Sequence, residues 1–352
     1  MSIALQFARL KAKTSVRAIV LGAGISLTAC VALSYSPGPV SITLADGVAG
    51  TAETRVTFVS KDAYDFGDMI SGAAPDRIVH GDLILPPGDG SVRGTAILSH
   101  GSGGTGARQT QMAETLVNAG YAAFILDHFT PREIGSTVAD QLLVTAQMMM
   151  MDVFEARDLL STHPRIDADR VGVMGWSKGA ITAALSSVDR LAGYADDGSG
   201  RLAFSVAFYP FCGWDLDAET LATPTLYLMG SEDDWTPAAP CVRQAEAWAA
   251  NDQPIEWQVY DGAQHGFDSR SPDFTISRAI TVRDTSAKCT LRVSPEGRTE
   301  TLDGKHGLDS VDGRKAYLAD CGERGVGFGG NAAAREASLA RVLSFLDRTL
   351  TP

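Results

Sequence analysis

The stretch GWSKG at residues 175–179 follows an apolar run at 171–174 and precedes a run of small residues typical of a helix. This G-x-S-x-G pattern between a strand and a helix is typical of a nucleophile elbow, a sharp turn that exposes a serine hydroxyl. Side chains at positions 175 and 179 would collide with the strand and the helix, and glycine removes that collision. Because the pentapeptide is common, assigning Ser177 as a nucleophile requires a base, an acid and an oxyanion site elsewhere in the chain.

His265 is the histidine best placed to act as the base. Among the 6 histidines of the chain, it follows a late predicted strand directly, where α/β enzymes place their working groups. An acid that orients the histidine is expected after the strand predicted at 224–229, where Glu232, Asp233 and Asp234 are adjacent. Residue type alone does not choose among these acids. The order serine, acid, histidine is that of α/β-hydrolases.

Backbone amides are expected to form the oxyanion hole. One donor would be the N–H of Lys178, the residue after Ser177, and the other would come from the glycine-rich loop at 100–104. Ser102 and Gly103 are the candidates for this second donor. Such donors stabilise the negative charge that develops on the carbonyl oxygen during attack by serine.

The same loop is compatible with a different chemistry. Residues 101–106 read GSGGTG and are followed by Asp127, which satisfies the pattern of a dinucleotide-binding loop. A nicotinamide-dependent dehydrogenase is therefore one alternative, and a non-catalytic binding protein with a hydrolase fold is another. The hydrolase is favoured because Ser177, Asp233 and His265 would have no role in a dehydrogenase.

Four residues near these motifs are interpreted as lying beside the substrate: His100, Trp176, Asp127 and Arg132. For Asp127 and Arg132 the alternative is structural, as a hydrogen bond at a strand end and as a surface cation. The side chain of Lys178 is expected to face solvent on the first turn of its helix. We expect neither a metal nor another cofactor, because no group of His, Asp and Glu has the spacing of metal ligands.

Strands and helices are expected to alternate along most of the chain, which predicts an α/β fold with a mostly parallel central sheet and helices on both faces. A hairpin-type turn is expected at 86–88, and residues 269–330 are interpreted as an insertion or flap that contains a hairpin at 288–302. The four methionines at 148–151 are expected to pack in the core. The strands are predicted at 55–60, 78–85, 94–99, 121–126, 171–174, 204–209, 224–229 and 255–260, and the main helices at 107–119, 138–161 and 332–350.

The first 35 residues are interpreted as a targeting segment, with residues 36–52 as a linker to a catalytic domain at 53–352. Basic residues precede an uncharged run at 18–35, as in an export signal. The sequence LTAC ending at Cys30 resembles the lipobox of bacterial lipoproteins. A cleaved signal and an uncleaved membrane anchor remain as alternatives. A periplasmic or extracellular protein is expected, with a possible membrane tether.

Cysteine usage agrees with an oxidising compartment. Apart from Cys30, the chain contains Cys212, Cys241, Cys289 and Cys321. Three pairings are possible, and chain order suggests Cys212 with Cys241 and Cys289 with Cys321. Four unpaired thiols are the alternative. The net charge of −12 makes nucleic acid an unexpected partner, because so acidic a surface repels phosphate.

The chain resembles the dienelactone hydrolase family of α/β-hydrolases. The stretches that carry the resemblance are SHGSGG (99–104), LDHFTPR (126–132), IDADRVGVMGWSKGA (166–180), AFYPFCGW (207–214), GSEDDWTPAAPC (230–241) and YDGAQHGFD (260–268).

The resemblance implies that Ser177 is the nucleophile, Asp233 the acid and His265 the base. The namesake enzymes of the family use cysteine as the nucleophile, whereas this chain has serine. This difference favours ordinary esters over dienelactone, so the expected substrate is a small ester or lactone. The expected reaction is hydrolysis through an acyl-enzyme.

Overall fold

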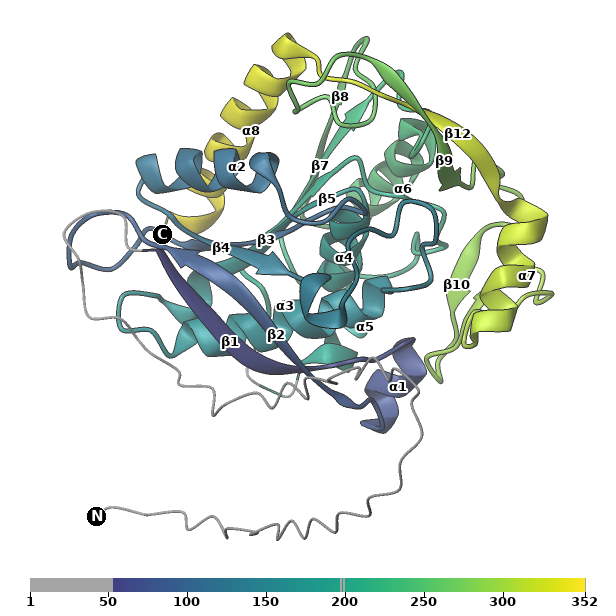
Figure 1. The fold of residues 1–352 in the computed structure, drawn as a ribbon, viewed down its shortest axis with the longest axis horizontal. Helices are drawn as coiled ribbons and strands as arrows, with labels where there is room; N and C mark the ends of the chain where they lie inside the picture. The colour runs from purple at the N-terminus through teal and green to yellow at the C-terminus, as the bar shows by residue number, and fades with distance from the viewer. Residues whose placement is uncertain (1–52, 197, 199, 352) are drawn as a thin grey trace, which may run out of the picture. The chain divides into compact units, whose positions relative to one another are not determined.

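The computed structural model describes residues 53–196, 198 and 200–351, so the predicted export segment, the linker and Cys30 lie outside the described residues. An eight-stranded sheet with the order β1-β2-β4-β3-β5-β6-β7-β8 organises this part of the chain (Figure 1). All neighbours from β4 to β8 are parallel, whereas β2 is antiparallel to both β1 and β4. The strands are β1 (Glu53–Lys61), β2 (Asp76–Ile84), β3 (Thr95–Ser99), β4 (Ala122–Asp127), β5 (Val171–Trp176), β6 (Ser205–Phe208), β7 (Thr225–Gly230) and β8 (Ile255–Tyr260).

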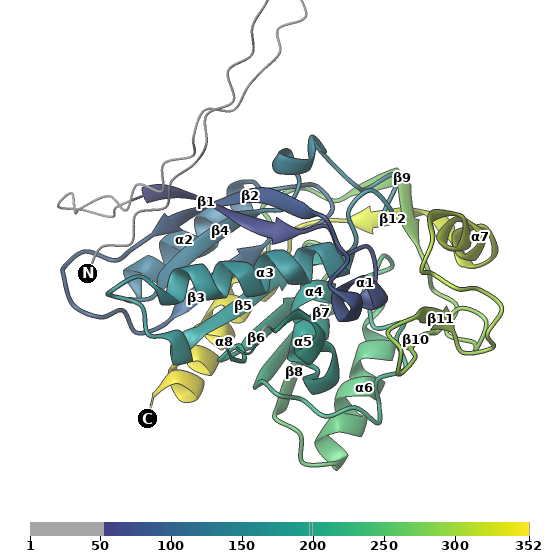
Figure 2. The ribbon, with the colours of Figure 1, turned by 90° about the horizontal axis from the view of Figure 1, so that it is seen from below.

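Helices cover both faces of this sheet, so the predicted α/β architecture is confirmed (Figures 1 and 2). One hydrophobic cluster joins the sheet to α2 and α8, and another joins it to α3, α4, α5 and α6. The residues of β3 and β5 are all buried, as expected for central strands of a parallel sheet. The helices are α1 (Phe66–Ser71), α2 (Ala107–Asn118), α3 (Ala146–Ser161), α4 (Lys178–Ser187), α5 (Asp189–Ala195), α6 (Ala238–Ala250), α7 (Val311–Cys321) and α8 (Ala332–Leu350).

Two predictions of local structure were wrong. The hairpin-type turn at 86–88 does not join neighbouring strands, because β4 lies between β2 and β3 in the sheet. The helix predicted from residue 138 begins only at Ala146, where the side chain of Thr145 accepts a hydrogen bond from the backbone N–H of Met148. A threonine that caps a helix in this way marks its first turn. Residues 138–145 form a loop instead.

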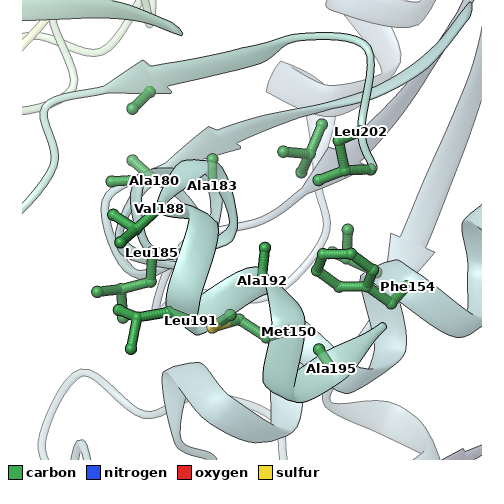
Figure 3. Packing of buried hydrophobic residues seen from close by; sticks show 14 of the residues in the cluster. Met150, Phe154, Ala180, Ala183, Leu185, Val188, Leu191, Ala192, Ala195 and Leu202 are labelled. Atoms are coloured by element: carbon green, nitrogen blue, oxygen red, sulfur yellow. The ribbon is translucent and has the colours of Figure 1, made fainter. Parts of the chain in front are cut away.

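Three of the four methionines of α3 are fully in the core, as predicted, and Met148 is partly buried and packs against it. Met149, Met150 and Met151 are buried. Figure 3 shows Met150 and Phe154 packed with apolar residues of α4 and α5. The flexible methionine side chains fill the irregular space between these helices.

Residues 269–330, which we interpreted as an insertion and refer to by that name below, contribute no strand to the eight-stranded sheet. The insertion contains two strands paired with each other, β9 (Phe274–Thr281) and β12 (Glu323–Phe328), a hairpin of β10 (Leu291–Val293) and β11 (Thr299–Thr301), and α7. The predicted hairpin is therefore confirmed. Both disulfides suggested by chain order are present, Cys212–Cys241 and Cys289–Cys321. Within the residues that the structure covers, no helix is long and apolar enough to cross a membrane.

Candidate active site

Ser177 occupies a strained turn between β5 and α4, with a positive φ of 53°. A non-glycine residue with positive φ is uncommon and is held only where the surrounding structure forces it. A Cβ on Gly175 would overlap the backbone of Gly179, and a Cβ on Gly179 would overlap the carbonyl group of Ser99. The two glycines therefore allow the strand, the turn and the helix to approach one another, as the sequence pattern predicted.

The structure brings Ser177, Asp233 and His265 together at the carboxyl ends of β5, β7 and β8. His265 Nε2 lies 3.0 Å from Ser177 Oγ, and His265 Nδ1 lies 2.8 Å from Asp233 Oδ2. Because a carboxylate can only accept, Nδ1 carries the proton that is donated to Asp233. Nε2 is then free to accept the proton of the Ser177 hydroxyl.

Among the three adjacent acids, only Asp233 contacts His265. Asp233 is buried, and its Oδ1 accepts hydrogen bonds from the backbone N–H groups of Trp235 (2.9 Å) and Thr236 (2.8 Å). Glu232 is exposed. The side chain of Asp234 is 51% exposed and lies near Arg283. The turn after β7 thus directs Asp233 inward and the two other acids outward.

Three further residues surround the imidazole of His265 and were not identified from the sequence. The hydroxyl of Thr236 lies 3.1 Å from both Asp233 Oδ2 and His265 Nδ1. The rings of Tyr209 and Trp235 lie 4.5 Å and 4.6 Å from the imidazole ring. The only sequence signal was the spacing of Asp233 and Thr236, which is typical of a turn closed by an aspartate side chain.

Asp268 is a second buried carboxylate close to the site. It accepts hydrogen bonds from the hydroxyl of Tyr209 (2.8 Å) and from the indole nitrogen of Trp176 (2.7 Å), and Arg108 pairs with it at 3.4 Å. Burial raises the pKa of Tyr209, so this hydroxyl stays protonated and donates. Trp176, which was expected beside the substrate, is fully buried and fixed by Asp268 instead.

A mostly apolar cavity of about 180 Å³ opens beside Ser177. Its lining includes Ser177, Ser102 and Lys178, which follow strands of the central sheet. Arg314 and Tyr317, which also line it, belong to α7 of the insertion. The cavity is similar in volume to one of about 150 Å³ that holds a benzene molecule. It therefore has room for a small apolar group next to the serine.

The loop at 100–104 lies against the elbow, as a second source of oxyanion donors must. A Cβ on Gly101 would stand 3.0 Å from the carbonyl oxygen of Trp176 and 3.3 Å from Ser177 Cβ. Ser102 lines the cavity. A Cβ on Gly103 would meet no atom within 4 Å. The loop thus approaches the serine closely at Gly101 and is more open at Gly103.

His100 fixes this loop from below rather than lining the cavity. Its Nε2 accepts a hydrogen bond from the backbone N–H of His128 (3.1 Å), so its Nδ1 is the protonated nitrogen and donates to the carbonyl of Gly101 (2.8 Å). Burial, reinforced by the neighbouring His128, lowers the pKa of His100 to about 3. The ring is therefore neutral near pH 7 and holds one fixed tautomer.

Asp127 and Arg132 are occupied by structural contacts below the same loop. Asp127 Oδ1 accepts from the backbone N–H groups of Phe129 and Thr130 at 2.9 Å and 3.0 Å. Although burial favours protonation, hydrogen bonds from His80 and Thr130 hold the pKa of Asp127 well below its usual range. Arg132, for which a surface cation was the alternative, is instead a buried one.

Arg132 forms ion pairs with two carboxylates. Its guanidinium lies 2.8 Å from Asp152 Oδ2 and 2.8 Å from Asp62 Oδ1, and its side chain is only 5% exposed. Asp152 also accepts from His128 Nδ1 (2.8 Å). These contacts join the segments that follow β1 and β4 to α3.

The expectation that Lys178 faces solvent was wrong. The residue is 5% exposed, and its ammonium group donates to the carbonyl oxygens of Gln141 (2.8 Å) and Val144. Burial lowers the pKa of Lys178 to about 7, and the nearby Arg314 also lowers it. This burial is not visible in the sequence, because the residues that Lys178 contacts come from the loop before α3.

Comparison with protein families identifies one match. The model of the Dienelactone hydrolase family matches residues 85–292, which is more than half of the chain. The match contains the elbow, the acid and the histidine, and ends within the insertion. No curated protein matches the chain in sequence.

Solved structures similar to the chain have low sequence identity to it. A candidate dienelactone hydrolase from Klebsiella pneumoniae is 16% identical with a TM-score of 0.44, over 76% of this chain and 98% of that one. A dienelactone hydrolase-like promiscuous phosphotriesterase from metagenomic libraries is 15% identical with a TM-score of 0.43, over 62% and 85% of the two chains. A propionate-bound esterase from Thermogutta terrifontis is 18% identical with a TM-score of 0.44, over 53% and 80%.

Proposed function

The chain belongs to the dienelactone hydrolase family, and from this premise we propose that it is a serine esterase that uses Ser177, His265 and Asp233 as its catalytic triad. Membership of the family makes it a hydrolase acting on ester bonds. The observation that carries the finer proposal is the position of His265, which bridges Ser177 Oγ at 3.0 Å and Asp233 Oδ2 at 2.8 Å. A nucleophile bonded to a base that is oriented by a third group is the arrangement of serine hydrolases.

In the first step, Ser177 Oγ attacks the ester carbonyl carbon while His265 Nε2 takes its proton. Asp233 stabilises the imidazolium through Nδ1 and keeps its own charge. The imidazolium then gives its proton to the departing alkoxide, which leaves as the alcohol. The acyl group remains on Ser177 as an ester.

In the second step, water attacks the acyl-enzyme with His265 again as the base. The carboxylic acid leaves and Ser177 recovers its proton. In both steps the backbone N–H of Lys178 and that of Ser102 or Gly103 would hold the oxyanion. The close approach of the 100–104 loop to Ser177 at Gly101 supports this assignment, and each such donor typically contributes about 3 kcal/mol.

The substrate is proposed to be a small carboxylic ester or lactone with an apolar group. The cavity beside Ser177 is mostly apolar and small. Its apolar lining residues include Ile181 of α4, Phe211 after β6 and Leu318 of α7. These side chains would enclose one hydrocarbon part of the ester.

The enzyme is also proposed to act outside the cytoplasm. The disulfides Cys212–Cys241 and Cys289–Cys321 indicate an oxidising compartment. The basic and apolar residues of the first 35 positions support export. Acylation of Cys30 would anchor the mature chain to a membrane, and the mass of its N-terminal peptide distinguishes this from a cleaved signal or an uncleaved anchor.

Hydrolysis of p-nitrophenyl esters of short acids tests the proposed function. Wild-type protein is expected to turn over p-nitrophenyl acetate or butyrate with a burst of one p-nitrophenol per chain. Ser177→Ala is expected to lower kcat by at least about 10⁴-fold while circular dichroism stays unchanged. Activity retained by a folded Ser177→Ala protein would overturn the proposal.

A further inference from the structure

We propose that the side chain of Lys178 is a positioning residue that holds the loop of Ser102, and with it the second oxyanion donor, in place beside Ser177. The inference rests on the proposed esterase function. It concerns the side chain of Lys178, whereas the oxyanion hole uses only the backbone N–H of the same residue.

The ammonium group of Lys178 is attached to the segment that precedes α3. It donates to the carbonyl oxygens of Gln141 and Val144. Both carbonyls belong to the part of the chain that was expected to continue the helix, where they would have accepted from backbone amides. Lysine takes the place of those amides, so it fixes this segment in its non-helical path across the cavity.

This segment in turn holds Ser102. Gln141 Oε1 accepts a hydrogen bond from Ser102 Oγ at 3.1 Å. The carbonyl oxygen of Ser102 accepts from the backbone N–H of Thr137 at 2.8 Å and from Ser136 Oγ at 3.0 Å. Three hydrogen bonds thus join Ser102 to residues 136–141, and Lys178 secures the end of that stretch. Residues 136–141 therefore connect the side chain of Lys178 to Ser102, whose loop provides the second oxyanion donor.

The cost of burying this lysine indicates a role beyond stability. Lys178 is 5% exposed; Asp140 acts on it favourably, but among the described residues no carboxylate forms an ion pair with its ammonium group. A buried ammonium without a paired carboxylate is expensive, and an apolar residue of similar size often stabilises a fold better. We therefore expect the buried ammonium group of Lys178 to be retained because it keeps the groups around Ser177 in position.

The loop is held from two sides that respond differently to pH. Below it, His100 is neutral and bonds to Gly101. Above it, burial lowers the pKa of Lys178 to about 7; Arg314 of α7 lowers it further, and Asp140 opposes this. Hydrogen bonds from a charged donor are about twice as strong as neutral ones. Loss of the proton of Lys178 should therefore loosen the outer contact and lower kcat as pH rises above 7.

The decisive experiment compares kcat and KM for p-nitrophenyl butyrate between pH 6 and 9 in wild type, Lys178→Arg and Lys178→Met. In the wild type, kcat is expected to fall several-fold above pH 7. Lys178→Arg stays charged throughout this range, so its kcat should lack that fall. Lys178→Met should lower kcat about 100-fold at all pH values, as a displacement of about 1 Å can, and change KM less than threefold.

Gln141→Ala provides the second test, because it removes the bond to Ser102 and keeps the carbonyl that Lys178 contacts. Its kcat should fall about tenfold, and the double variant with Lys178→Met should lose no more than Lys178→Met alone, since the two residues act in series. Additive losses, or the same fall of kcat above pH 7 in Lys178→Arg, would overturn the inference. If neither lysine variant folds, an unchanged kcat in Gln141→Ala overturns it.

These outcomes are distinguishable from failure of the proposed function. An active Ser177→Ala protein would contradict the esterase mechanism itself. An inactive Ser177→Ala protein together with unchanged kcat values in Gln141→Ala and Lys178→Met would leave the mechanism standing and remove only the role of Lys178.

Discussion

His128 and His265 each bridge a serine hydroxyl and an aspartate with almost the same distances. His128 Nε2 lies 2.9 Å from Ser99 Oγ and its Nδ1 lies 2.8 Å from Asp152 Oδ2. His265 makes contacts of 3.0 Å and 2.8 Å with Ser177 and Asp233. Hydrogen bonding alone therefore does not distinguish the two sets. Burial does, because Ser99, His128 and Asp152 are completely buried, whereas Ser177 lines the cavity.

A fluorophosphonate probe is expected to label Ser177 and to leave Ser99 unmodified. The probe needs a serine that is both activated and accessible; Ser177 lines the cavity, whereas Ser99 is completely buried. Peptide mapping by mass spectrometry after labelling identifies the modified residue. Ser99→Ala is the control and should still be labelled, although loss of the Ser99 hydroxyl should lower the free energy of unfolding by about 1–3 kcal/mol. Modification at Ser99 would contradict the assignment.

Asp233→Asn and Asp234→Asn should have very different effects on kcat. Asparagine at 233 can accept from the backbone but no longer fixes the tautomer of His265, so kcat should fall by about 10⁴-fold. The side chain of Asp234 is 51% exposed and lies away from the imidazole, so its variant should change kcat less than threefold. Steady-state kinetics measures both. A larger loss in Asp234→Asn would move the role of the acid to that residue.

Gly179→Ala should prevent correct assembly of the elbow. The added methyl group would overlap the backbone carbonyl of Ser99, which cannot move without disturbing the buried strand β3. We expect a loss of more than about 4 kcal/mol in the free energy of unfolding, or insoluble protein. Gly90→Ala is the matched control, since its Cβ would meet no atom within 4 Å. Equal urea midpoints for the two variants would contradict the steric argument.

Acid should destabilise the protein partly through His100. Burial lowers the pKa of His100 to about 3 in the folded state, against its ordinary value of 6.5. Between these values the unfolded chain binds a proton that the folded chain does not, so the stability falls as pH falls below 6.5, by up to about 1.4 kcal/mol per pH unit. Urea unfolding from pH 7 to pH 4.5 measures this slope. His100→Gln, which does not titrate, should show a shallower slope, and an unchanged slope would refute the prediction.

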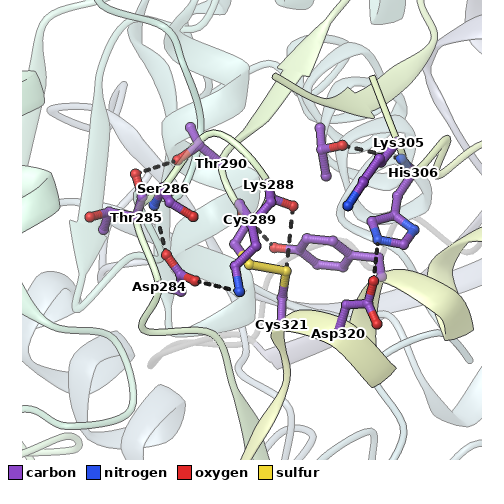
Figure 4. The surroundings of a disulfide bond; sticks show 12 residues. Asp284, Thr285, Ser286, Lys288, Cys289, Thr290, Lys305, His306, Asp320 and Cys321 are labelled. Carbon is purple, nitrogen blue, oxygen red and sulfur yellow. Dashed lines mark hydrogen bonds and ion pairs between the residues drawn. A yellow bond between two sulfur atoms is a disulfide. The ribbon is translucent and has the colours of Figure 1, made fainter. Parts of the chain in front are cut away.

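The disulfide of the insertion should affect substrate binding more than chemistry. Figure 4 shows Cys289–Cys321 with the ion pairs Asp284–Lys288 and His306–Asp320 nearby. Cys321 ends α7, which contributes Arg314 and other residues to the cavity. The double variant Cys289→Ala/Cys321→Ala should therefore raise KM about fivefold or more and change kcat little. Its free energy of unfolding should fall by about 2–5 kcal/mol. An unchanged KM at lowered stability would show that the bond only stabilises the insertion.

The positions of Ser177, Asp233 and His265 could be predicted because each lies in the turn or loop that follows a parallel strand of the sheet. The carboxyl ends of such strands meet at one edge, so chain order and strand position are sufficient. Strong local signals also succeeded elsewhere. The helix predicted at 332–350 has the bounds found in the structure, since its apolar spacing and flanking residues are both visible in the sequence.

The surroundings of the triad could not be predicted, because they depend on contacts between distant segments. Asp268 accepts hydrogen bonds from Tyr209 and Trp176 and pairs with Arg108, and these three residues come from different parts of the chain. Lys178 has no local sequence sign of burial, because its ammonium group is bound by the loop before α3. The start of α3 was missed for the same reason, since the carbonyls of the preceding loop are bonded to Lys178 and not to the helix.

Each disulfide joins cysteines that are consecutive along the chain, with separations of 29 and 32 residues. An oxidase that pairs cysteines in the order in which they leave an export channel would therefore form Cys212–Cys241 and then Cys289–Cys321 without later isomerisation.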